Sequence, residues 1–281
     1  MKTINLIIVF LLSLLATSCS SDETQPLATD ETAGLSLVTE LSNANHTVQL
    51  YTPTGFLQQG YNAISIRIKN NATGKYEENA SLSWMPLMQM MTMQHSCPRS
   101  AINKAPGTPT LYSGYVVFQM AQNDMEHWQL AINYTINGQA YAVSGQVNVP
   151  PSARQRVASF VGYDGNRYVV ALVSPETPQV GTNAITVAVF RMQDMMTFPV
   201  ADNLTLIPDP RMPGMGNHGS PVNSSLVQEA TGGFYQGTVS LTMTGYWKIS
   251  LIMKNASGDI IKGEAVTDTT PASSLYLEME F

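Results

Sequence analysis

From Leu35 onward the chain is a succession of short segments in which apolar and polar residues alternate, each bounded by Gly, Asn or Pro. Alternation with a period of two places every second side chain on one face of a strand. No segment keeps a helical period over three turns. The pattern predicts an all-β chain built as a β-sandwich. The predicted strands include residues 47–51, 63–69, 115–120, 128–134 and 140–149, with a hairpin turn at Asn137-Gly138.

The same series of motifs occurs twice along the chain. Each copy begins with Gly-x-Asn-Ala-Ile, continues through Met-Pro-x-Met and His-x-x-Pro, and ends with Trp-x-(Leu/Ile)-x-(Leu/Ile). The copies begin at Gly60 and Gly181. This spacing is much longer than the repeat of a solenoid protein. We therefore predict two tandem domains, residues 36–150 and 157–281, each of them a β-sandwich.

The N-terminus is typical of an export signal. Lys2 precedes an apolar run over residues 4–15 that is too short for a typical membrane-spanning helix. The following Leu-Ala-Thr-Ser-Cys19 resembles the lipobox of bacterial lipoproteins, which implies lipid attachment at Cys19. We predict a signal peptide over residues 1–18 and a flexible tether over 19–35. The mature protein would then sit in the cell envelope, periplasmic or surface-exposed, anchored to the membrane by lipid alone.

Charge and cysteine content narrow the function. Charged residues make up 12% of the chain and the net charge is −6, whereas nucleic-acid binding normally needs a basic face. We therefore expect no nucleic-acid partner. The chain has two cysteines, so lipid on Cys19 would leave Cys97 alone and no internal disulfide.

Two methionine-rich segments, residues 84–98 and 211–221, carry the candidate chemistry. A thioether is a neutral, polarisable ligand that suits Cu(I), and imidazole is a common partner for copper. If residues 91–95 are extended, Met91, Met93 and His95 share one face. We predict two ligand sets, with Cys97 as an extra ligand if its thiol stays reduced. The first set is Met85, Met88, Met91, Met93 and His95, and the second is Met212, Met215 and His218.

A structural reading of the same residues stays open. Methionine fills irregular apolar gaps, so the segments could pad a sandwich or form an adaptable contact surface. Met192, Met195 and Met196 have no histidine nearby in sequence and are read as core or interface. His46 and His127 lack methionine neighbours and are read as surface or hydrogen-bonded residues.

The repeated motifs, taken together, resemble the YtkA-like and FixH-like domains over nearly all of both halves. The resemblance implies immunoglobulin-like sandwiches of exported proteins, often found near heavy-metal efflux or copper-oxidase assembly systems. The expected function is a lipoprotein that binds Cu(I) in copper handling or delivery, with a copper-transport or oxidase-assembly protein as partner. The alternative is a structural or adhesive module that binds a protein or a glycan.

Enzymatic activity is not expected. The sequence has no Gly-x-Ser-x-Gly elbow, no Walker loop and no His-Glu-x-x-His, and it has only four histidines. A catalytic copper or zinc centre usually needs clustered imidazoles or carboxylates, and the sequence shows no such cluster.

Overall fold

The computed structural model describes residues 30–281, of which Thr32–Phe281 forms one compact unit. The predicted signal peptide, Cys19 and most of the tether lie outside the described residues. Strands make up the regular structure, apart from the short 3-10 helix η1 (Pro213–Met215). The predicted all-β fold class is confirmed. None of the described residues forms a helix long and apolar enough to span a membrane.

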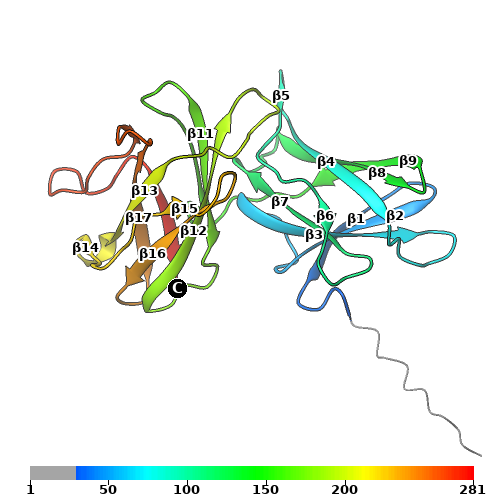
Figure 1. Cartoon of the computed structure of the whole chain (residues 1–281), viewed down its shortest axis with the longest axis horizontal. Coiled ribbons are helices and arrows are strands. Elements are labelled where there is room, and N and C mark those ends of the chain that lie inside the picture. Colours follow the sequence, from blue (N-terminus) through cyan, green and yellow to red (C-terminus); the bar gives the residue numbers. More distant parts are fainter. Residues whose placement is uncertain (1–29) are drawn as a thin grey trace, which may run out of the picture. The chain divides into compact units, whose positions relative to one another are not determined.

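The strands form four antiparallel sheets (Figure 1). The first sheet has the order β1 (Ser36–Ser42), β2 (His46–Thr52), β3 (Gly60–Asn70), β7 (Tyr112–Phe118) and β6 (Asn103–Lys104). The second has the order β5 (Gln94–His95), β4 (Ala80–Gln89), β8 (His127–Ile136) and β9 (Gln139–Val147). We call these two sheets the first sandwich.

The remaining two sheets form what we call the second sandwich. One has the order β10 (Val157–Val161), β11 (Arg167–Ser174), β12 (Gly181–Met192), β16 (Tyr235–Leu241) and β15 (Val227–Gln228). The other has the order β14 (His218–Gly219), β13 (Thr205–Met212), β17 (Tyr246–Lys254) and β18 (Ile260–Lys262), with β19 (Tyr276–Glu280) also paired to β17. The strand order of the second sandwich thus follows that of the first. The domain boundaries given above stay a prediction.

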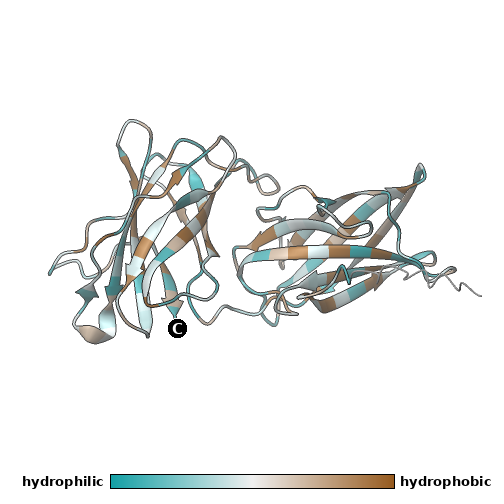
Figure 2. Cartoon of the chain, turned by 60° about the horizontal axis from the view of Figure 1, so that its bottom comes forward, coloured by the Kyte–Doolittle hydropathy of each residue, from teal (hydrophilic) through white to brown (hydrophobic). Residues whose placement is uncertain are grey.

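Apolar and polar residues alternate along the strands, and the apolar side chains form the core of each sandwich. Every second side chain of β3 from Asn62 to Ile68 is buried, and the hydropathy bands along the strands in Figure 2 follow the same period. The inward side chains of β2, β3 and β7 pack on Trp84, Trp128 and Ile132 of the facing sheet. A fully buried aliphatic side chain contributes about 1.5–3 kcal/mol, so these faces account for much of the stability.

The Gly-x-Asn motif performs the same local task in both sandwiches. The side chain of Asn62 accepts a hydrogen bond from the N–H of Gln58 (3.0 Å) and donates to the carbonyls of Gln58 (2.8 Å) and Gly60 (2.9 Å). Asn183 makes the equivalent three bonds in the second sandwich. Gly60 and Gly181 open β3 and β12 with φ of 109° and 114°, a conformation that favours glycine.

The predicted hairpin turn is present between β8 and β9. Asn137 and Gly138 both have positive φ, 51° and 80°, and Ile136 pairs with Gln139 across the turn. Positive φ at both central residues is the type I′ geometry that Asn-Gly favours.

A third apolar cluster involves residues of both sandwiches. It contains Val117 of β7 together with Val169 and Phe190 of β11 and β12. The rings of Tyr115 and Phe234 meet here with centroids 5.3 Å apart.

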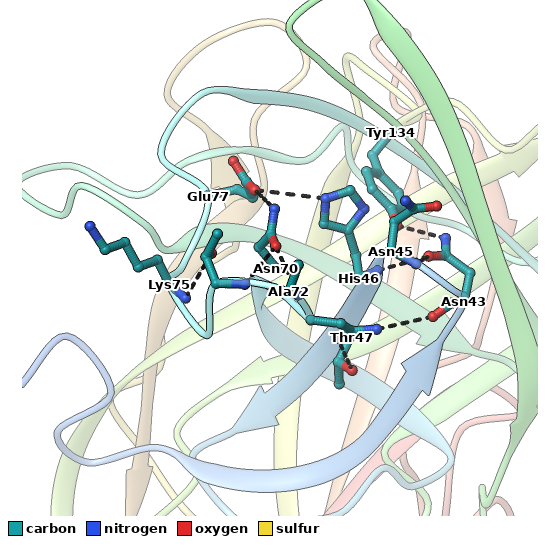
Figure 3. A network of polar contacts seen from close by, with 11 residues as sticks. Asn43, Asn45, His46, Thr47, Asn70, Ala72, Lys75, Glu77 and Tyr134 are labelled. Carbon is teal, nitrogen blue, oxygen red and sulfur yellow. Dashed lines mark hydrogen bonds and ion pairs between the residues drawn. The ribbon is translucent and has the colours of Figure 1, made fainter.

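His46 lies in a polar network of the first sandwich, shown in Figure 3. The side chain of Asn43 accepts a hydrogen bond from the N–H of His46 (2.8 Å) and donates to the hydroxyl of Tyr134 (2.9 Å). The Nε2 atom of His46 lies 3.7 Å from Oε1 of Glu77. His46 is buried, and its Nδ1 atom has no hydrogen-bond partner, which differs from the surface or hydrogen-bonded position expected.

Candidate functional site

The site is centred on His95, which ends the short strand β5. His95 pairs with Met88 of β4 and is only 9% exposed. Its ring stands edge-on to the ring of Trp128, with centroids 5.6 Å apart. The imidazole is therefore fixed on one side by the core of the first sandwich.

Both ring nitrogens of His95 have polar neighbours. Nδ1 lies 2.8 Å from the carbonyl oxygen of Ser96 and 3.4 Å from the amide nitrogen of Gln119, so it donates to the carbonyl in one tautomer and accepts from the amide in the other. In the tautomer that donates to Ser96, Nε2 is unprotonated and has a free lone pair. This nitrogen lies 3.3 Å from the sulfur of Met120, which also carries no proton. In that tautomer two lone-pair donors face each other without a hydrogen between them.

Two neighbouring side chains hold this pair in place. The indole N–H of Trp128 donates to the carbonyl oxygen of Met120 (3.0 Å). The amide of Gln119 donates to the carbonyl oxygen of Ser96 (3.2 Å), the same oxygen that accepts from His95. The other amide atom, Oε1 of Gln119, is buried and has no hydrogen-bond partner.

His95 and Met120 line a cavity of about 220 Å³. Most of its exposed lining is apolar, and the second sandwich contributes Met192, Met195 and Phe198 to it. The cavity is therefore lined by three methionines and one histidine from segments that are far apart in the sequence.

The structure separates the predicted ligands of the first set. Met88 is fully buried in the core of the first sandwich. The sulfur of Met85 accepts a hydrogen bond from the hydroxyl of Ser96 (3.5 Å), one residue from His95. Met91 and Met93 are 76% and 48% exposed at the turn between β4 and β5. Residues 91–95 are not one extended run, because the chain bends at Met91 and Thr92 before β5 begins.

The second predicted set is also dispersed. Met212 is buried in the core of the second sandwich, and it pairs with His218 across β13 and β14, as Met88 pairs with His95. His218 is exposed, and Met215 is 58% exposed in η1. The two histidines thus share a place in the strand order, but only His95 is buried.

Cys97 is fully buried in the core of the first sandwich. Burial raises the pKa of its thiol well above the usual range, and the nearby Arg99 opposes the shift only in part. Because the thiolate is the metal-binding form, this protonation state does not favour Cys97 as the extra ligand.

Sequence reasoning missed three of the four ligand candidates in the cavity. Met120 carries one signal, since the repeat aligns the segment Tyr112 to Met120 with Tyr235 to Met243. No sequence pattern points to Met192 and Met195, because His95, which lines the same cavity, is distant from them in the sequence. Among the described residues, no group of three or more His, Cys, Asp or Glu side chains could hold a metal ion. The candidate residues in the cavity are of another kind, because three of the four are methionines.

Part of the chain matches a known protein family. None of the curated proteins matches the chain. A solved structure, the chimeric titin Z1Z2-Z1Z2 tandem functionalized with a GRGDS exogenous peptide from fibronectin, is 12% identical. The match covers 80% of this chain and 93% of that chain, with a TM-score of 0.17. A family model described as YtkA-like matches residues 164–251. Over that segment, within the second sandwich, the chain is similar to the YtkA-like family.

Proposed function

We propose that the chain is a cell-envelope lipoprotein that binds the soft metal ion Cu(I) in copper handling or delivery. The observation that carries the proposal is the pair formed by Nε2 of His95 and the sulfur of Met120. Both residues line one cavity, and with the imidazole hydrogen on Nδ1 neither atom has a proton to share. A cation between them would satisfy both.

The separation of the two atoms suits one small ion. Metal–nitrogen and metal–sulfur bonds of about 2.0 and 2.3 Å, at a tetrahedral angle, place the two ligand atoms roughly 3.5 Å apart. The distance of 3.3 Å between Nε2 and the sulfur is close to this value. Little rearrangement of the side chains is needed for both to bind the same ion.

The ligand types favour Cu(I) over other common ions. Thioethers are soft and neutral, so they bind Cu(I) or Ag(I) well and Ca²⁺ or Mg²⁺ poorly. Thioethers also suit an oxidising envelope better than exposed thiols, which oxidise readily. A copper-transport or oxidase-assembly protein would be the exchange partner.

The decisive experiment is titration of residues 20–281, the predicted mature chain without the lipid-bearing Cys19, with Cu(I) under reducing conditions and with Ag(I). We expect about one ion per chain at the cavity and a higher melting temperature, because an ion that binds only the native state stabilises it. Met120→Leu should abolish this site, whereas Met243→Leu, its counterpart after β16, should leave it intact. Binding of neither ion to the wild-type chain would overturn the proposal.

The lipoprotein part of the proposal rests on the sequence around Cys19. In cells, the wild-type chain should fractionate with membranes and carry lipid. Cys19→Ser should release it from the membrane fraction, and retention of this variant on membranes would exclude a lipid anchor at Cys19.

One observation favours a second candidate, a β-sandwich module that binds a protein or glycan partner. Met91 and Met93 expose their thioethers at the turn between β4 and β5, where they could form an adaptable apolar contact. Capture of a partner that is lost on Met91→Ser, in a chain that binds no Cu(I) or Ag(I), would favour this alternative.

A further inference from the structure

The cavity beside His95 contains two thioethers from the second sandwich. Met192 is the last residue of β12, and Met195 lies in the loop that follows. Both side chains are partly buried and line the same cavity as His95 and Met120. Neither belongs to a methionine-rich segment that contains a histidine.

The loop that carries Met195 is held against the segment that carries His95. The N–H of Ser96 donates to the carbonyl oxygen of Met195 (2.8 Å). The guanidinium of Arg99 donates to the carbonyl oxygen of Met196 (3.2 Å) and to the hydroxyl of Ser96 (2.9 Å). One backbone hydrogen bond and one side-chain hydrogen bond therefore connect the two segments next to the imidazole.

The loop is also ordered internally. Oδ1 of Asp194 accepts the N–H of Met196 (2.7 Å), and this bond lowers the pKa of the Asp194 carboxyl. The N–H of Gln193 donates to the carbonyl oxygen of Thr197 (3.0 Å), which closes the loop. A tight loop of this kind limits the positions of the Met195 side chain and lowers the entropic cost of bringing its sulfur to an ion.

We infer that the soft-metal site is completed by the second sandwich, with Met195 and Met192 as ligands beside His95 and Met120. The inference rests on the proposed function and goes beyond it in assigning ligands to both sandwiches. His95 and Met120 alone give a two-coordinate site, and one or two further thioethers give the three or four soft ligands that hold Cu(I) firmly. All the donors are neutral. Arg167, which also lines the cavity, is exposed and its charge is screened by solvent.

A bipartite ligand set has a mechanical consequence. An ion bound to His95 and Met195 would join the two sandwiches directly, in addition to the two hydrogen bonds at Ser96 and Arg99. Binding would then protect the loop at residues 193–199 from local opening, because the bound ion stabilises only the closed arrangement. Release of the ion would loosen the same contact.

The test compares two variants of the mature chain. In the double variant Met192→Leu with Met195→Leu, the apolar volume is nearly kept, so folding should be little affected. We expect its Cu(I) affinity to fall by more than the roughly ten- to a hundredfold seen when groups behind metal ligands are lost, because two ligands are removed. X-ray absorption should also show fewer sulfur ligands per Cu(I) than in the wild type. Met196→Leu, in the same loop but outside this cavity, is the matched control and should bind as the wild type does.

Hydrogen exchange supplies the second readout. Added Ag(I) should slow exchange over residues 193–199 in the wild type and in Met196→Leu, but not in the double variant. If the double variant keeps wild-type affinity, sulfur count and protection, the inference is wrong while the proposed function stands. If the wild type binds no Cu(I) or Ag(I), both are wrong.

Discussion

The indole N–H of Trp128 donates a hydrogen bond to the carbonyl oxygen of Met120, with a distance of 3.0 Å. Trp247 makes the equivalent bond to Met243 in the second sandwich, at 2.9 Å. Both indoles are fully buried. The repeated fold therefore fixes a methionine backbone at the same point twice, but only Trp128 also packs edge-on against a buried histidine.

This relationship predicts that Trp128→Phe weakens the proposed metal site. The change removes the bond to the Met120 carbonyl and alters the wall against which His95 rests. We expect Ag(I) affinity to fall by roughly tenfold, as for other groups that orient metal ligands. The free energy of unfolding should also fall by about 1–3 kcal/mol, from the lost hydrogen bond and the lost packing.

Trp247→Phe is the control for that variant. It makes the same chemical change at the equivalent place, so its stability loss should be similar while its Ag(I) affinity stays at the wild-type value. Equal losses of affinity in both variants would mean that general destabilisation, and not the positioning of Met120, governs binding.

The Gly-x-Asn motif gives a prediction about stability alone. Asn62→Ala and Asn183→Ala each remove three hydrogen bonds and leave the backbone groups at the start of β3 or β12 without partners. Each change should lower the free energy of unfolding by about 1–3 kcal/mol, measured by chemical denaturation. Asn103→Ala, at an exposed position of β6, should cost much less. A loss at Asn62 no larger than that at Asn103 would contradict the assigned role.

The fold could be predicted because its signals are local. Alternation along β3 and the Asn137-Gly138 turn each specify a neighbouring stretch of chain. The recurrence of Gly-x-Asn at Gly60 and Gly181 marks equivalent strands, since only glycine readily adopts the positive φ found there. Element boundaries were less accurate, because β7 begins at Tyr112 and ends at Phe118, whereas residues 115–120 were expected.

The candidate site could be predicted only in part, because the residues that line its cavity meet through tertiary packing. His95 is in the cavity, but Met91 and Met93 beside it are turned out to solvent by the bend before β5. Met195 reaches the cavity through a hydrogen bond to Ser96 that no spacing rule describes. Local clustering of methionines in the sequence therefore does not identify the methionines that line the cavity with His95.

Burial of Cys97 predicts that its thiol reacts slowly. Because burial raises its pKa, the thiol stays protonated at neutral pH and through mildly alkaline pH, and the thiolate that reacts is scarce. In residues 20–281 Cys97 is the sole cysteine, so a thiol-specific reagent reports on it directly. Its reaction at pH 8 should be slower by roughly a hundredfold or more in the native chain than in denaturant. Rapid native labelling that Cu(I) blocks would instead support Cys97 as a ligand.

The last prediction separates the methionines of the exposed turn from those of the cavity. Met91→Ser with Met93→Ser changes two side chains that are 76% and 48% exposed, so the free energy of unfolding should change by less than about 0.5 kcal/mol each. Cu(I) stoichiometry and affinity should match the wild type in a competition titration. The single variant Met120→Leu, which alters one partly buried thioether 3.3 Å from His95, should lose the ion. If the double serine variant lost the ion and Met120→Leu kept it, the ligands would be those of the turn, as the spacing of Met91, Met93 and His95 first indicated.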